Sequence, residues 1–136
     1  MAVSPSSFLL DTSAYSAFQK GDPRLRAWFS SQYNINVPLI VIAELQAGFT
    51  AGSKTKENQE LLNRFLDSSP VEIIFPTLET TKKFAELFLQ LRTSGIALGT
   101  NDLWIAALAL EHNLPILTLD ADFQRVKGIK IISLTP

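Results

Sequence analysis

The sequence contains no cysteine and only one histidine, His112, among its 136 residues. The absence of cysteine excludes disulfide bonds, thiolate zinc sites and a cysteine nucleophile, and it is compatible with a reducing compartment. No apolar run approaches the roughly 18 residues that cross a membrane. The segment Met1–Ser7 lacks the basic and apolar regions of a secretion signal. We therefore expect a cytoplasmic protein that does not associate with membranes.

The chain also lacks an excess of charge of either sign. Its 13 acidic and 12 basic side chains give a net charge of −1, which argues at first against nucleic acid, because its partners are usually basic. If four acids gather at one site, however, nine acidic side chains remain against twelve basic ones elsewhere. Divalent cations bound at that site would also reverse its sign. A phosphate-bearing substrate therefore remains open.

Length and composition indicate one globular domain over residues 1–136. The hydrophobic fraction is 46% and the charged fraction 18%, as in ordinary folded proteins. A chain of this length buries about two thirds of the surface that its unfolded form exposes. No internal repeat, low-complexity segment or linker interrupts it.

Strand-like and helix-like segments alternate along the chain, which predicts an α/β fold with a parallel sheet. A short helix opened by Asp22-Pro23 is also expected. For the uniformly apolar residues 39–42, periodicity does not decide between helix and strand, although Pro38 favours a helix. The expected strands are 8–10, 34–37, 71–75, 116–120 and an edge strand 130–134, and the other expected helices are 12–20, 38–48, 54–67, 77–92 and 100–113.

Two of the expected strands end in an aspartate. Asp11 follows the apolar residues 8–10, and Asp120 ends the run that begins at Ile116. Ligands of parallel sheets bind at the carboxyl ends of the strands, although either aspartate could instead cap the following helix. If the two strands are neighbours, the Cα atoms of the two aspartates lie roughly 5 Å apart. Their mutual repulsion would then require a nearby positive charge or a protonated carboxyl.

Further acids stand in unusual places. Glu44 lies within an apolar run, where glutamate is rarely buried without a partner, although a solvated helix face would also explain it. Asp102 opens an apolar helix with Thr100 or Asn101 as its N-cap, but an acid in the first turn is also favoured by the helix dipole. Asp122 lies in a turn, where it could simply be solvated.

The joint candidate site consists of Asp11, Glu44, Asp102 and Asp120. Four carboxylates without cysteine form an all-oxygen set, which suits Mg²⁺ or Mn²⁺ better than zinc. The sole histidine, His112, is expected at the surface near the end of its helix. Such a cluster can hold divalent ions that activate water and stabilise a phosphoryl transition state.

Four blocks of sequence resemble the PIN-domain family, and within it the VapC-type toxins of bacterial toxin–antitoxin pairs. The blocks are Asp11-Thr12-Ser13 after its strand, then 37–48, 101–109 and 117–123, and together they span nearly the whole chain. Each block alone is unspecific, whereas their order and spacing are specific. The resemblance implies a three-layer α/β/α domain with a central parallel sheet of four to five strands. It also implies a metal-dependent endoribonuclease that hydrolyses RNA to a 3′-hydroxyl and a 5′-phosphate.

The same resemblance implies roles for the acids. Asp11 and Asp102 would be the principal metal ligands, and Glu44 a ligand or a water-orienting group. Asp120 would bind a second or weaker ion, and Asp122 lies close enough in sequence to substitute for it.

The resemblance also implies accessory residues and partners. Ser13 and Thr118 match positions where the family often places a hydroxyl near the site, and Asn101 adjoins Asp102. The implied partners are RNA, an antitoxin whose tail occupies a groove, and a second copy of the chain. Basic residues near the blocks could position RNA, although ordinary solvation is the favoured explanation for them: Lys20, Arg24, Arg26 and Arg125. An aromatic set could line the groove, although core packing is the default explanation for most of its members: Trp28, Phe29, Tyr33 and Phe49.

Two other functions remain open. A receiver- or phosphatase-like domain would use the Asp120-Ala121-Asp122 pair, but this pair lies close to the end of the chain. The strand 71–75 is followed by Pro76-Thr77 rather than by an acceptor aspartate. A PIN-like binding module without catalysis is the other alternative, although such a module would be expected to lack some of the acids.

Overall fold

The computed structural model describes residues 5–134. The expectation about Met1–Ser7 therefore rests partly on residues outside this range. The strands are β1 (Ser7–Leu10), β2 (Asn34–Pro38), β3 (Val71–Ile74) and β4 (Ile116–Leu117). The α-helices are α1 (Thr12–Gln19), α2 (Leu39–Ala51), α3 (Thr55–Leu66), α4 (Leu78–Thr93) and α5 (Thr100–His112), and two 3₁₀ helices are η1 (Arg26–Phe29) and η2 (Ala121–Arg125).

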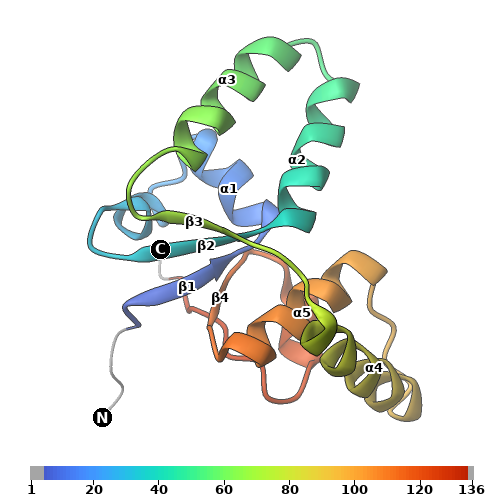
Figure 1. Ribbon diagram of the computed structural model, residues 1–136. Helices are drawn as coiled ribbons and strands as arrows, with labels where there is room; N and C mark the ends of the chain where they lie inside the picture. The colour runs from blue at the N-terminus through green and yellow to red at the C-terminus, as the bar shows by residue number, and fades with distance from the viewer. Residues whose placement is uncertain (1–4, 135–136) are drawn as a thin grey trace.

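The sheet forms the middle of three layers (Figure 1). Its strand order is β3-β2-β1-β4, and every neighbouring pair is parallel. Helices α1, α2 and α3 lie on one side of the sheet, and α4 and α5 lie on the other (Figure 1). The expected α/β/α architecture with a four-stranded parallel sheet is therefore confirmed.

The central strand and one helix supply much of the core. Phe8, Leu9 and Leu10 of β1 are fully buried, as expected for a strand covered on both faces. In α5, Leu103 and residues 105–109 are buried, which confirms that this helix, apolar on nearly all sides, lies inside the fold. These two elements carry Asp11 and Asp102, so both acids stand on well-anchored backbone.

The apolar run 39–42 belongs to a helix. Pro38 ends β2 in an extended conformation with φ −63° and ψ 141°, and α2 begins at the next residue. A proline at this point costs the helix no hydrogen bond, because the first amides of a helix have no intrahelical acceptor. Val41, Ile42 and Leu45 face the core, and Glu44 lies between them on the same helix.

Three predictions about local structure are wrong. Asp22-Pro23 opens a turn rather than a helix, because the Asp22 carboxylate accepts the backbone N–H of Arg24 and only the 3₁₀ helix η1 follows. The strand after Pro115 ends at Leu117 and not at Asp120, because β1, its partner, ends at Leu10. Residues 130–134 form only an isolated bridge, between Ile131 and Ile116.

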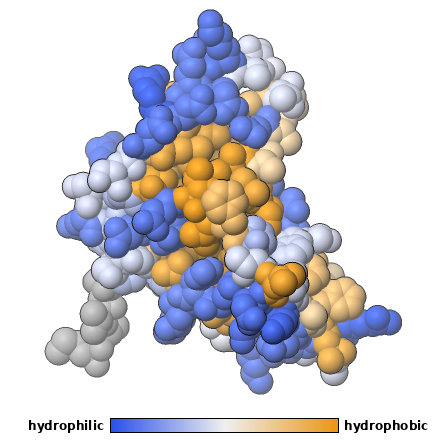
Figure 2. Space-filling model, viewed as in Figure 1, coloured by the Kyte–Doolittle hydropathy of each residue, from blue (hydrophilic) through white to orange (hydrophobic). Residues whose placement is uncertain are grey.

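Apolar side chains are exposed along the β3 edge of the sheet. Leu39, Ile73 and Phe75 are exposed, with Phe75 at 57%. Figure 2 shows an apolar area at the centre of this face, bordered by polar helices above and below. Within residues 5–134, no helix is both long and apolar enough to cross a membrane.

Candidate active site

Asp11 is a buried carboxylate at the end of β1. It is 4% exposed and occupies the N-cap position of α1, yet its side chain makes no capping hydrogen bond. Its Oδ2 instead accepts hydrogen bonds from Thr118 Oγ1 at 2.6 Å and Ser13 Oγ at 2.9 Å. Both hydroxyls reach the same oxygen, which leaves Oδ1 available to a ligand.

The two hydroxyls also connect Asp11 to the end of β4. Ser13 Oγ accepts the backbone N–H of Leu119 at 3.0 Å, and Thr118 Oγ1 accepts that of Asp120 at 2.9 Å. Because a hydroxyl carries one proton, both hydroxyls can donate to Asp11 while accepting from the backbone. Ser13 and Thr118 thus lie at the site, where the sequence predicted a hydroxyl.

Glu44 reaches the site from α2. Its Oε1 accepts a hydrogen bond from Thr12 Oγ1 at 2.7 Å, and its Oε2 accepts one from Asn101 Nδ2 at 3.4 Å. The side chain is half-buried. The contact of Thr12 with Glu44 is not predicted by the sequence, in which the one signal is the position of Thr12 directly after Asp11, at the first turn of α1.

Asp102 lies in the first turn of α5. The N-cap residue is Gly99, so the prediction of Thr100 or Asn101 as the cap is wrong. Residues 99–102 and Glu44 line an open cavity of about 350 Å³. The helix start therefore presents Asp102 and Asn101 to the same space that Glu44 enters from α2.

The acids influence one another electrostatically. The pKa of Asp102 is raised to about 6, chiefly by burial and then by the negative charges of Asp11, Asp120, Glu44 and Asp122. Burial also raises the pKa of Asp11. The hydrogen bonds from Thr118 and Ser13 lower this pKa in part, and the negative charge of Glu44 raises it further. The negative charges of these four acids therefore lie close enough to Asp102 to disfavour its ionised form.

Asp120 lies beyond the end of β4, which stops at Leu117 and not at Asp120 as the sequence predicted. The register pairs Leu10 with Leu117, which places Thr118 rather than Asp120 beside Asp11. The expectation that Asp11 and Asp120 end neighbouring strands at the same level is therefore wrong. Asp120 caps η2 by accepting the backbone N–H of Asp122 at 2.9 Å, so its capping role is confirmed.

Asp122 differs from the other acids. It is exposed, and its carboxylate pairs with Arg125 Nη2 at 3.1 Å. A carboxylate already neutralised by a guanidinium is a poorer cation ligand. Of the two acids in this turn, Asp120 is thus the better candidate for the site.

The donor set fits a hard divalent cation that keeps part of its water shell. Within residues 5–134, no three His, Asp or Glu side chains stand close enough together, as oriented here, to hold an ion. Mg²⁺ usually takes only one or two carboxylates and completes its octahedron with water and substrate phosphate. Oxygen ligands around Asp102 suit that mode, and His112, exposed at the far end of α5, takes no part.

The basic residues near the site are mostly exposed. Arg24 is bound to Asp22 at 2.7 Å, and Arg125 donates to the carbonyl of Ala97 as well as to Asp122. Lys20 and Arg26 are exposed.

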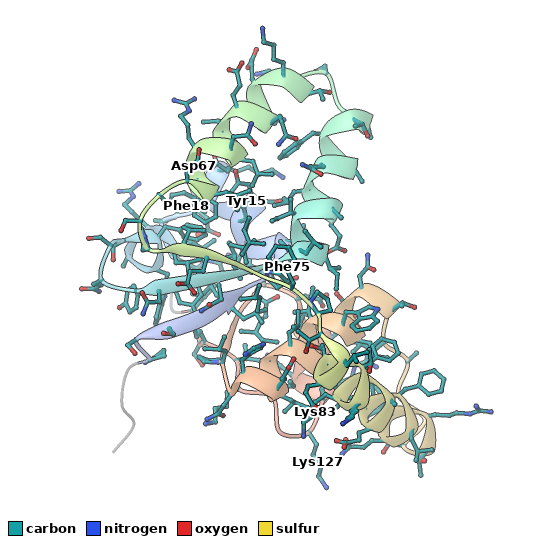
Figure 3. All side chains as sticks on the ribbon, viewed as in Figure 1. Tyr15, Phe18, Asp67, Phe75, Lys83 and Lys127 are labelled. Atoms are coloured by element: carbon teal, nitrogen blue, oxygen red, sulfur yellow. The ribbon has the colours of Figure 1, made fainter. Side chains whose placement is uncertain are left out.

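The aromatic residues proposed to line a groove pack against the core instead. Trp28, Phe29, Tyr33 and Phe49 are partly buried against the core. Phe49 of α2 also lines a cavity of about 230 Å³, together with Tyr15 of α1 and Leu61 of α3; Tyr15 is labelled in Figure 3.

Without bound metal, we expect Asp102→Asn to raise the melting temperature at pH 7.5. The pKa of Asp102 is about 6 in the folded protein, against an ordinary value of 3.8. Folding therefore takes up a proton at pH values between 3.8 and about 6, and the free energy of unfolding falls as the pH rises through this range. An asparagine carries no such penalty. Thermal melts in EDTA should show a gap between variant and wild type at pH 7.5 that narrows at pH 4.5. The same gap at both pH values would contradict this origin.

Comparisons with known proteins agree with this geometry. The sequence profile of the PIN domain matches residues 8–129. Ribonuclease VapC5 of Mycobacterium tuberculosis is 29% identical over 128 residues, covering 94% of this chain and 93% of that protein. Ribonuclease VapC2 of Rickettsia felis is 35% identical over 96 residues, covering 70% of each.

Solved structures show the same likeness. In the VapBC2 complex of Rickettsia felis bound to a promoter DNA fragment, one chain superimposes with a TM-score of 0.83 at 28% identity, covering 95% of this chain and 99% of that one. A chain of the VapBC-5 complex of Mycobacterium tuberculosis has a TM-score of 0.74, also at 28% identity, over 96% of this chain and 100% of that one. Fold, buried aspartate and sequence profile agree, and the chain belongs to the PIN-domain family.

Proposed function

We propose that this protein is a VapC-type endoribonuclease that depends on Mg²⁺ or Mn²⁺ and acts in the cytoplasm as the toxin of a toxin–antitoxin pair. The observation that carries the proposal is the buried Asp11, which accepts hydrogen bonds from Thr118 and Ser13 at the carboxyl ends of the strands. Asp11 acts electrostatically on Asp102, as do Glu44, Asp120 and Asp122. The relatives named as ribonucleases and the neighbours from VapBC complexes support the same function.

In this proposal the acids divide the work by their surroundings. Asp11 Oδ1 and the Asp102 carboxylate would hold the cation, and Asp120 would hold a second or weaker one. Such a cation, when bound, lowers the pKa of water and offsets the charge that develops on the phosphate. Glu44, fixed at Oε1 by Thr12, is left to orient the attacking water through Oε2. Water then adds to phosphorus as the bond to the 3′ oxygen breaks, which leaves a 3′-hydroxyl and a 5′-phosphate.

We expect Asp11→Asn to lower the rate of RNA cleavage in Mg²⁺ or Mn²⁺ at least about a hundredfold, because even groups that merely support a metal ligand often cost ten- to a hundredfold. An amide can still accept the hydrogen bonds of Thr118 and Ser13, so the fold should persist. The measurement is cleavage of a labelled RNA, with the circular dichroism spectrum as the check on folding.

Asp67→Asn is the matched control. Asp67 is an exposed aspartate at the end of α3, away from the site (Figure 3). This variant should cleave RNA at the wild-type rate. If the Asp11→Asn protein cleaves as fast as its control, Asp11 has no place in the reaction.

Two protein partners belong to the proposal. The structural neighbours from VapBC complexes support an antitoxin. The cavity lined by Tyr15, Phe49 and Leu61 offers apolar surface that could receive a side chain of the antitoxin. Exposed apolar side chains at the β3 edge, Ile73 and Phe75, support a second copy of the chain.

For the partners we expect two results. The purified chain alone should have twice its mass of 15.0 kDa in solution, as measured by light scattering. Expression of the chain should arrest growth, and co-expression of a small adjacent gene should relieve the arrest and yield a complex. A monomeric mass at micromolar concentration would remove the homodimer, and harmless expression would count against a toxin.

A further inference from the structure

A cavity adjoins the acids and is lined mostly by residues that have no role in the reaction described above. It has a volume of about 370 Å³ and shares Thr118 and Asp120 with the site. This volume lies within the range of small-ligand pockets. Its remaining wall comes from the turn after α1, from η2 and from the segment that follows it, through residues that include Arg24, Gln124 and Ser133.

Arg24 is held in a defined orientation at this cavity. The Asp22 carboxylate accepts from Arg24 Nε at 3.1 Å and from Nη2 at 2.7 Å, and it also accepts the backbone N–H of Arg24 at 3.0 Å. Such a two-point pair fixes the plane of the guanidinium. Since a guanidinium has five N–H donors, the remaining ones are free to meet a ligand. Asp22 is therefore a positioning residue for Arg24.

The other walls combine polar and apolar groups. Gln124 and Ser133 are exposed side chains that can both donate and accept hydrogen bonds. Leu119 is 38% exposed, and Ile131 and Leu134 are half-buried, so apolar surface is also accessible in the cavity. A flat apolar ring with a hydrogen-bonding edge, which is the chemistry of a nucleobase, matches this lining better than a bare phosphate does.

We propose that this cavity binds one unstacked base of the RNA next to the cleaved phosphodiester, with Arg24 and Gln124 contacting its polar edge. The inference rests on the proposed ribonuclease function, because Asp120 belongs both to this cavity and to the acidic site. Proteins read single-stranded RNA through splayed bases that are bonded along their edges. The cavity then selects which base may flank the cut.

The test maps the cut sites of Arg24→Ala and Gln124→Ala on a pool of RNAs randomised around the cleaved bond. Both variants should keep cutting, but the base preference at one position beside the cut should fall about tenfold, as expected for loss of an edge contact worth 1–3 kcal/mol. KM should rise more than kcat falls. Arg64→Ala and Gln90→Ala, on the exposed surfaces of α3 and α4, are the matched controls and should cut as the wild type does.

A second measurement does not depend on cleavage. In an Asp102→Asn background, fluorescence anisotropy with short single-stranded RNAs that differ in one base should show discrimination, which Gln124→Ala removes. An unchanged cut pattern together with unchanged discrimination would overturn the cavity proposal. If the wild type cleaves no RNA, the proposed function fails, and the binding measurement alone then decides whether the cavity takes a base.

Discussion

Repulsion between carboxylates at one edge of a parallel sheet is the constraint on which this structure depends. The pKa of Asp102 is raised to about 6, chiefly by burial, and the negative charges of Asp11, Asp120, Glu44 and Asp122 raise it further. A fold that stabilised only itself would have no reason to gather like charges around a partly buried group. The cost is understandable if a divalent cation and a substrate phosphate complete the site, because the same charges then become favourable.

The core is what permits this unfavourable arrangement. Asp11 directly follows the buried residues Phe8–Leu10 of β1, and Asp102 opens the buried helix α5, so neither backbone can move away from the other without exposing apolar surface. Hydroxyls do the fine positioning: Thr118 and Ser13 hold Asp11 by one oxygen, and Thr12 holds Glu44 by one oxygen. Asp11 is thereby oriented and keeps Oδ1 for a ligand, whereas Oε2 of Glu44 also accepts a hydrogen bond from Asn101.

The architecture could be predicted from sequence because it depends on long, regular patterns, and the proposed site residues followed from the ends of those elements together with the resemblance to PIN domains. The buried run before Asp11 and the apolar helix after Asp102 allow few other placements. The failures concern short-range geometry. Asp22 binds Arg24 and forms a turn, which residue propensities do not distinguish from a helix N-cap. The strands β1 and β4 end at the same level, so that Thr118 and not Asp120 lies opposite Asp11. The hydrogen bond from Thr12 to Glu44 could not be predicted, because a hydroxyl at a helix start is common and its distant partner is known only from the structure.

The central claim is that the acids at this edge of the sheet bind a divalent cation. Carbon-detected NMR of the Asp102 carboxyl group tests this claim most directly. In the metal-free protein the account predicts a titration near pH 6. Adding Mg²⁺ should lower the pKa of Asp102 toward or below its ordinary value of 3.8, which is roughly a hundredfold or greater fall in proton affinity. An Asp102 that titrates near 3.8 without metal, or whose titration ignores added Mg²⁺, would contradict the account.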